Sequence, residues 1–281
     1  MSRNLLPGTQ IEILNQVERG RFKYALFDFD GTVSLLREGW PRIMGPVMVE
    51  MICGETKPTP EIEQEVRDYI DESTGIQTIL QMEHLVEMVR AHGLVPEDKM
   101  LDAYGYKEIY NDRLMVPVRD RIARLKSGQL TLEQVTVRGS LEFLKRLRER
   151  GITMYVFSGT DRDDVRNEAK VVTAAPYFDE IWGALRTVEE YSKDKVIKEL
   201  IAAHQLHGAE VLIVGDGPVE IRNAKENGCV ALGVASDEAA GHGWNEEKHR
   251  RLTRAGADIL IPDFGEIDAL LQYLFPACSC S

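Results

Sequence analysis

The sequence lacks long hydrophobic runs and has few cysteines. Its apolar stretches are short, as in VLIV at 211–214, whereas a membrane span needs about 20 apolar residues. Residues 1–16 contain no apolar core followed by a small-residue cleavage site, so we expect neither a membrane span nor a secretory signal. Four cysteines are too few for a disulfide framework in 281 residues, which favours a reducing, cytoplasmic location.

An excess of positive charge is also missing. Lysine and arginine number 34 against 46 aspartates and glutamates, which gives a net charge of −12. Binding to nucleic acid or to an anionic membrane depends on clustered cations, so the composition argues against both partners. Hydrophobic residues make up 43% and charged residues 28%, which is typical of a globular protein. At about 150 residues per domain, the length predicts about two domains.

Short apolar segments rich in β-branched or aromatic residues predict five buried strands. They lie at 24–27, 152–157, 211–214, 230–234 and 258–261. Helical patterns occupy most of the intervals, such as Leu141, Leu144 and Leu147 with Gly151 as a stop signal. Strands that alternate with helices predict an α/β fold, in which helices flank a Rossmann-like parallel sheet.

Residues 37–135 interrupt this alternation. Their apolar residues recur at helical spacing, and no buried-strand pattern appears over the whole segment. We therefore predict an all-α domain at 37–135, inserted into a sheet domain formed by residues 1–36 and 136–281. Residues 1–20 receive no assignment within the sheet domain.

Two aspartates, Asp28 and Asp30, follow the first predicted strand, and Gly31 comes next. Because side chains alternate along a strand, both carboxylates should point the same way at its carboxyl end, where open parallel sheets bind ligands. Two close carboxylates repel each other and call for a cation, and Mg²⁺ is the natural candidate. The alternative is that the Asp-Gly step merely forms a turn.

Polar residues also end two later strands. Ser158 and Gly159 follow the second strand, where a hydroxyl beside a glycine-opened turn offers donors to an oxyanion. Asp216 ends the third strand, and Glu220 follows four residues later. An ordinary loop and a helix-capping acid are the alternative interpretations of these two segments.

Two lysines, Lys193 and Lys195, open the helix that precedes the third strand. Either one could reach the strand edge and neutralise a phosphate, and the alternative for each is a solvated helix start.

Taken in order, the motifs Asp-x-Asp-Gly-Thr, Ser-Gly-Thr, Lys and Gly-Asp resemble those of haloacid dehalogenase-like hydrolases. The resemblance covers about 21–35 and 136–275, which is essentially the whole predicted sheet domain. The inserted helical segment resembles the cap of phosphoglycolate phosphatase-like and β-phosphoglucomutase-like members.

The resemblance implies a role for each acid of the site. Asp28 would be the nucleophile that forms an aspartyl-phosphate, and Asp30 the general acid and base. Asp28, the main-chain carbonyl of Asp30 and the carboxylate of Asp216 would hold Mg²⁺. Glu220 stands where many relatives have aspartate, and it would either coordinate the metal through a water molecule or hold the lysine in place.

The resemblance also implies which groups bind phosphate and substrate. Ser158 and the amides around Gly159 would bind the phosphoryl oxygens. Lys193 matches the family pattern Lys-x-x-Val-Ile, with Lys195 as the alternative. The candidates for substrate specificity are Arg37, Trp40, Thr74 and Gly75, for which packing within the helical domain is the alternative.

Two further segments receive structural interpretations. The charged run at 246–254 is interpreted as a solvent-exposed helix face. Cys278 and Cys280 are interpreted as part of a frayed end rather than a metal or redox site.

The function that the resemblance implies is a Mg²⁺-dependent phosphatase for a small phosphorylated metabolite, such as a sugar phosphate or a phosphoglycolate-like compound. Asp30 argues for phosphoryl chemistry, because haloacid dehalogenases lack this second aspartate. A phosphomutase of the β-phosphoglucomutase type and a non-catalytic phosphometabolite-binding protein remain alternatives. We expect a monomer or a homodimer.

Overall fold

The computed structural model describes residues 3–185 and 192–276, and Cys278 and Cys280 therefore lie outside the described residues. A seven-stranded sheet forms its centre, in the order β1-β7-β6-β5-β2-β3-β4. β1 pairs antiparallel with β7, and all other pairs are parallel. The strands are β1 (Glu12–Ile13), β2 (Tyr24–Phe27), β3 (Thr153–Asp161), β4 (Glu180–Ala184), β5 (Val211–Gly215), β6 (Val230–Val234) and β7 (Ile259–Ile261).

The α/β fold with a mainly parallel sheet is confirmed, and all five predicted strands are present. Two strands, β1 and β4, escaped prediction. β1 has only two residues and comes from the segment that received no assignment. β4 is an edge strand whose first three residues are exposed or half-buried, so it has no continuous apolar run.

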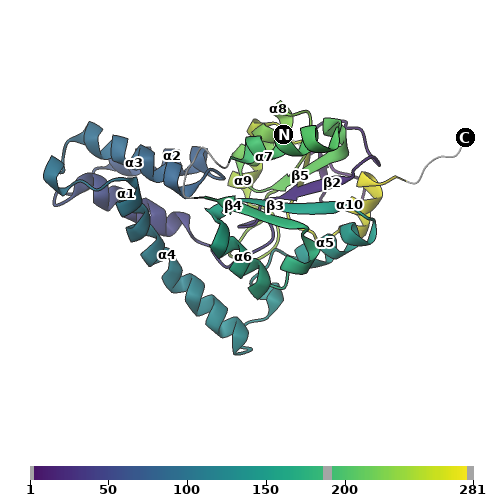
Figure 1. Cartoon of the computed structure of the whole chain (residues 1–281), viewed down its shortest axis with the longest axis horizontal. Coiled ribbons are helices and arrows are strands. Elements are labelled where there is room, and N and C mark those ends of the chain that lie inside the picture. The colour runs from purple at the N-terminus through teal and green to yellow at the C-terminus, as the bar shows by residue number, and fades with distance from the viewer. Residues whose placement is uncertain (1–2, 186–191, 277–281) are drawn as a thin grey trace, which may run out of the picture.

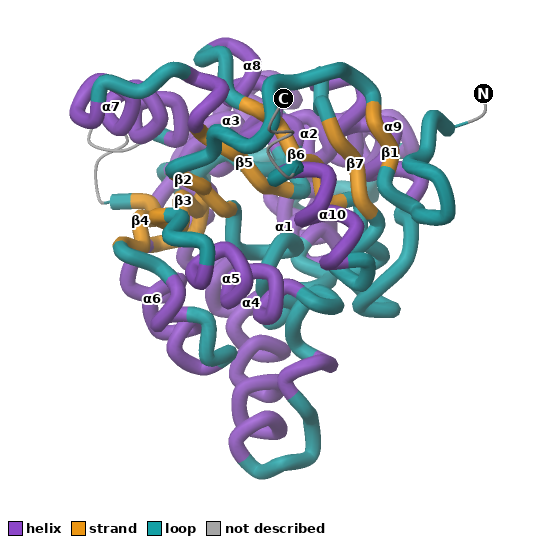
Figure 2. The backbone as a smooth tube through the Cα atoms, turned by 90° about the vertical axis from the view of Figure 1, so that its right-hand side faces the viewer, coloured by secondary structure: helices purple, strands orange, loops and turns teal. Residues whose placement is uncertain are grey.

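Helices cover both faces of the sheet (Figure 2). Consecutive residues of β2 point to opposite faces, so Ala25 and Phe27 join one hydrophobic cluster and Leu26 joins the other. Three helices line the first face and three the second. They are α5 (Ser140–Glu149), α6 (Arg162–Val171) and α10 (Ile267–Leu274) on the first, and α7 (Lys193–His204), α8 (Pro218–Glu226) and α9 (Glu246–Ala255) on the second.

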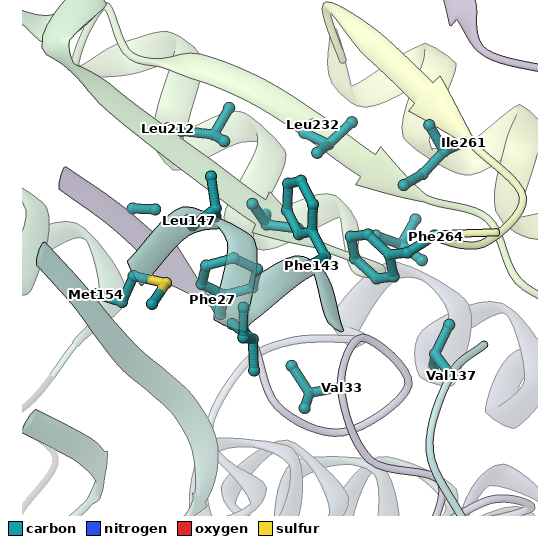
Figure 3. Packing of buried hydrophobic residues seen from close by; sticks show 14 of the residues in the cluster. Phe27, Val33, Val137, Phe143, Leu147, Met154, Leu212, Leu232, Ile261 and Phe264 are labelled. Atoms are coloured by element: carbon teal, nitrogen blue, oxygen red, sulfur yellow. The ribbon is translucent and has the colours of Figure 1, made fainter. Parts of the chain in front are cut away.

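Aromatic side chains fill the centre of the first face (Figure 3). The ring of Phe143 from α5 stacks on Phe264 at 4.9 Å between centroids and meets Phe27 edge-on at 6.2 Å. All three rings are fully buried. This packing fixes β2, and thereby the position of the aspartates that follow it.

The segment from α1 to α4, residues 41–126, is helical, as predicted, and lies beside the sheet rather than on one of its faces (Figure 1). Its helices share a buried cluster, which includes Met48, Leu85 and Tyr106 and is separate from the two clusters on the sheet. This separation supports the proposed inserted domain at 37–135. The helices are α1 (Pro41–Cys53), α2 (Pro60–Ser73), α3 (Thr78–His92) and α4 (Ala103–Lys126), and we call them, with their connecting loops, the cap.

Short 3-10 turns complete the described secondary structure, at Glu97–Lys99, Leu132–Gln134, Ala175–Tyr177 and Gly208–Glu210. Within residues 3–185 and 192–276, no helix combines the length and the hydropathy that crossing a membrane would require.

Candidate active site

The first motif leaves the sheet at the carboxyl end of β2. The main-chain N–H of Asp28 still donates to Val214 O at 2.8 Å, which continues the pairing with β5. The chain then turns at Gly31, whose φ of +74° favours glycine. A Cβ at this position would lie 2.3 Å from Oδ2 of Asp216, so a side chain here would displace that carboxylate.

The Asp28 carboxylate is buried and paired with a lysine. Nζ of Lys193, the first residue of α7, lies 2.8 Å from Asp28 Oδ1 and also contacts the fully buried Glu220. The structure therefore brings Lys193 to the side chain of Asp28. The side chain of Lys195 is half exposed instead, and its Nζ lies 4.0 Å from Glu199.

The second aspartate has a different environment. Thr160 Oγ1 donates to Oδ2 of Asp30 at 2.8 Å. Oδ1 of Asp30 is buried without a hydrogen-bond partner and lies 4.0 Å from Nε of Arg37. A carboxyl group with one unsatisfied oxygen can carry and transfer a proton, which fits the role that the motif implies.

Burial and charge raise the pKa of both aspartates. Burial is the largest cause for Asp28 and raises its pKa to about 7, while Lys193 opposes the shift. Burial also raises the pKa of Asp30 to about 7, with Arg37 opposing and the Glu168 carboxylate adding to the shift. Asp216 raises both values further, which shows that the three carboxylates share one electrostatic site.

Ser158 and Gly159 lie at the end of β3, beside the two aspartates. Ser158 is buried, and its Oγ accepts a hydrogen bond from Thr160 N at 3.1 Å. Both residues line the same pocket as Asp28 and Asp30. Their predicted place near the reacting phosphate is thus compatible with the structure.

Arg37 lines this pocket, but it is not a free cation. Nη2 of Arg37 lies 2.7 Å from Glu168 and 3.3 Å from Asp164, both on α6. Burial would lower the pKa of Arg37, but the carboxylates of Glu168 and Asp30 outweigh burial and raise it. Glu168 was missed by sequence reasoning, because a glutamate in an amphipathic helix gives no sign that it is buried.

The carboxylate of Asp216 forms an ion pair with a second buried lysine. Nζ of Lys248, on α9, lies 2.7 Å from Asp216 Oδ2 and 2.6 Å from Glu238 Oε1, and its side chain is only 8% exposed. The prediction of a solvent-exposed face at 246–254 is wrong for this residue. A lysine stem is long enough to bury its ammonium group against a distant carboxylate, and the polarity of the run cannot reveal this.

The loop between α2 and α3 covers the site. A Cβ on Gly159 would lie 2.4 Å from Ile76 O, and one on Gly75 would lie 2.5 Å from Glu220 Oε1. The glycines therefore permit a close approach of the cap loop to the sheet edge. Two ion pairs also join the cap to the sheet domain, Lys107 to Asp161 at 2.6 Å and Arg251 to Asp71 at 3.1 Å.

The pocket between cap and sheet contains most of the predicted residues. Trp40, Thr74 and Gly75 line the side of the pocket opposite the sheet edge, and their role in substrate specificity stays a prediction. Sequence reasoning missed further residues on that side, because their helical spacing indicates only packing within the cap. These are Thr78, Gln81, Tyr110 and Leu114.

The donor atoms of this site suit a hard divalent cation. Asp28 and Asp216 could supply carboxylate oxygens and Asp30 a main-chain carbonyl, and Mg²⁺ prefers such oxygen ligands. Within the described ranges, no group of three or more His, Cys, Asp or Glu side chains is arranged to hold a metal ion. Burial raises the pKa values of Asp28 and Asp30, and a bound cation would favour their ionised forms; Oδ1 of Asp30 is also buried without a hydrogen-bond partner.

Comparisons with known proteins show which known structures share this fold. The chain is similar in structure to a predicted phosphoglycolate phosphatase from Haemophilus somnus 129pt, with 16% identity, 90% and 99% of the two chains covered and a TM-score of 0.59. It is also similar to a β-phosphoglucomutase from Clostridium difficile, with 12% identity, 90% and 97% covered and a TM-score of 0.59. A third similar structure is a predicted phosphatase from Clostridium acetobutylicum, with 16% identity, 90% and 99% of the two chains covered and a TM-score of 0.58.

These structural likenesses show the fold, and the sequence shows the family. None of the curated proteins matches the chain. The sequence model for haloacid dehalogenase-like hydrolases, however, matches residues 25–234, which include both aspartates of the first motif, Ser158, Lys193 and Asp216. The chain belongs to the haloacid dehalogenase-like hydrolase family.

Proposed function

We propose that the protein is a phosphatase that hydrolyses a phosphomonoester of a small metabolite through a phosphorylated aspartate. The observation that carries this proposal is that two aspartates at one sheet edge have different partners. Lys193 holds Asp28, whereas Asp30 keeps an unpartnered oxygen and a bond to Thr160. Such a pair divides naturally into a nucleophile and an acid–base group.

The first half of the reaction transfers the phosphoryl group to the protein. A carboxylate oxygen of Asp28 attacks phosphorus, and the bond from phosphorus to the substrate oxygen breaks. Asp30 donates its proton to that leaving oxygen, so that an alcohol departs. Lys193, beside Asp28, offsets negative charge that gathers on the transferring group.

The second half releases phosphate. Asp30 takes a proton from water, the water oxygen attacks phosphorus, and the bond from phosphorus to Asp28 breaks. Orthophosphate leaves, and Asp28 and Asp30 return to their starting states. Ser158 and the amides near Gly159 would hold the phosphoryl oxygens through both steps.

Asp28, the carbonyl of Asp30 and Asp216 would hold Mg²⁺. When bound, this ion supplies positive charge against the phosphoryl oxygens.

The cap side of the pocket favours an uncharged leaving group. Among the described residues of 37–135 that line it, Arg37 is the one charged side chain, and Glu168 and Asp164 already neutralise it. Trp40, Tyr110 and Leu114 add apolar and aromatic surface. A second anionic group on the substrate would lose its hydration here without gaining a cation. We therefore propose a neutral, partly apolar alcohol as the leaving group.

Orthophosphate release from a panel of phosphomonoesters with MgCl₂ tests this function. The panel contains sugar phosphates, aryl and alkyl phosphates and 2-phosphoglycolate. We expect release that EDTA abolishes, with phosphates of neutral alcohols preferred over 2-phosphoglycolate. Isomerised sugar phosphate without net phosphate release would establish a phosphomutase instead. Tight ligand binding without turnover would establish a non-catalytic binding protein.

A further inference from the structure

Lys248 is a buried cation that the proposed reaction does not use. Its ammonium group lies within hydrogen-bond distance of two carboxylates, those of Asp216 and Glu238. Asp216 is a proposed metal ligand, whereas Glu238 has no part in the family motifs described above. The buried lysine therefore reaches the metal site from outside the sequence motifs.

The backbone of Lys248 is held in place as firmly as its side chain. Asn245 caps α9, and its Oδ1 accepts a hydrogen bond from Lys248 N at 3.0 Å. Lys248 and Leu252, one turn apart, are the buried residues of α9. The N-cap hydrogen bond of Asn245 and the two buried residues of α9 together direct the lysine toward the sheet edge. The contact with Asp216 therefore follows from the placement of the whole helix.

The contact occupies one of the two carboxylate oxygens of Asp216. Oδ2 accepts from Lys248, while Oδ1 lies 3.4 Å from Thr32 Oγ1, a long and weak contact. The backbone of Gly31 also lies close to Oδ2, since a Cβ at Gly31 would lie 2.3 Å from this oxygen. A divalent cation at Asp216 must therefore either take Oδ1 beside a positive charge or replace the ammonium group on Oδ2.

We propose that Lys248 is a tethered counter-ion that competes with Mg²⁺ for Asp216 and so lowers the affinity of the protein for the metal. This inference rests on the proposed function, because it takes Asp216 as a metal ligand. Like charges repel, and a buried ammonium group that loses a carboxylate partner loses a charge-assisted hydrogen bond. Both effects oppose metal binding.

Other carboxylates lie near Lys248 and could accept its ammonium group after a metal ion displaces it from Asp216. A second pocket opens beside Asp216, and it is lined by Lys248 together with Asp237, Glu238 and Glu247. The lysine can keep its bond to Glu238 and turn toward these carboxylates when Asp216 binds metal. Competition at Asp216 is therefore reversible and requires no movement of α9.

The experiment measures Mg²⁺ binding without reference to activity. Lys248→Met and Lys248→Gln are compared with the wild-type protein, all stripped with EDTA and then titrated with MgCl₂ while thermal unfolding is followed. The dependence of Tm on MgCl₂ gives Kd, because a ligand that binds only the native state stabilises it by RT ln(1 + [L]/Kd). Lys198→Met is the control, since it removes a lysine that is exposed and paired with Asp194 on α7.

We expect both Lys248 variants to bind Mg²⁺ about tenfold more tightly than the wild type, because each loses the positive charge. Both should have a lower Tm in EDTA, and Lys198→Met should match the wild-type Kd. Unchanged or weaker binding in Lys248→Met, with normal binding in the wild type, overturns the competition but leaves the proposed function intact. Absence of Mg²⁺ binding in all the proteins overturns the metal site itself, and this inference with it.

Discussion

Nζ of Lys193 lies 2.8 Å from Oδ1 of Asp28, although 165 residues separate them in the chain. The contact joins the first turn of α7 to the end of β2, and Glu220 holds the same ammonium group from α8. Asp28 is thereby kept at a fixed place beside a positive charge.

Asp28→Asn should abolish phosphatase activity while leaving the fold intact. The amide is not an effective nucleophile, so we expect kcat to fall by about 10³-fold or more. Orthophosphate release measures the loss, and circular dichroism checks the fold. Asp68→Asn, at an exposed acid of α2 that contacts Gln64, is the matched control and should keep wild-type activity. Activity retained in Asp28→Asn would refute a phosphorylated Asp28.

Lys193→Met and Lys195→Met should behave very differently, although only one residue separates the two positions. Lys193 is buried against Asp28 and Glu220, whereas Lys195 is half exposed. Loss of a charge aimed at the transferring group costs about 10²–10³-fold in kcat, so Lys193→Met should show this loss. Lys195→Met should stay within about twofold of wild type. Steady-state kinetics measures kcat for both variants. Equal losses of kcat would show that the effect of Lys193 does not depend on its proximity to Asp28.

The stability of the protein in EDTA should fall as pH rises from 5 to 7. The native pKa of Asp28 is raised by burial to about 7, so the native state holds a proton that the unfolded chain has released. This contribution is fully present below the unfolded pKa and is lost as pH rises through about 7. For one proton the slope is at most about 1.4 kcal/mol per pH unit.

Urea unfolding of wild type and Asp28→Asn at several pH values measures this dependence. The asparagine variant cannot titrate at this position, so its free energy of unfolding should rise relative to that of the wild type as pH increases from 5 to 7. Addition of MgCl₂ should flatten the wild-type curve, because the cation favours the ionised carboxylate. Parallel curves for the two proteins would show that Asp28 is ionised throughout this range.

Gly159→Ala should prevent the cap loop from closing on the sheet edge. The new Cβ would lie 2.4 Å from Ile76 O, so loop and strand must separate. We expect kcat/KM to fall by about tenfold or more, with a change in Tm of a few degrees at most. A larger radius of gyration by small-angle X-ray scattering would report the separation directly.

Gly45→Ala is the control for this substitution. Its Cβ would meet Ile70 Cδ1 at an ordinary 3.7 Å, and alanine favours the helix α1. Activity should therefore be unchanged. If Gly159→Ala also keeps wild-type kinetics and dimensions, the contact between the cap loop and Gly159 is not required for turnover.

The local pattern of the chain determined the sheet domain, the helical insertion and the three strand-end motifs. Apolar runs identified the buried strands because burial on both faces leaves little choice of residue type. The rule that ligands bind at the carboxyl ends of parallel strands then placed Asp28, Ser158 and Asp216 at one edge. The structure brings these residues into one pocket.

Only the tertiary structure decided how the charges of this edge are partnered. Arg37, predicted to face the substrate, is bound by Glu168, and Lys248, predicted to face solvent, is buried on Asp216. The reason is physical. An ion pair depends on the distance between two side chains from remote segments, and helical periodicity says nothing of that distance. The sequence indicated that Asp28, Asp30 and Asp216 meet, and the packing of α6 and α9 decided how Arg37 and Lys248 are paired beside them.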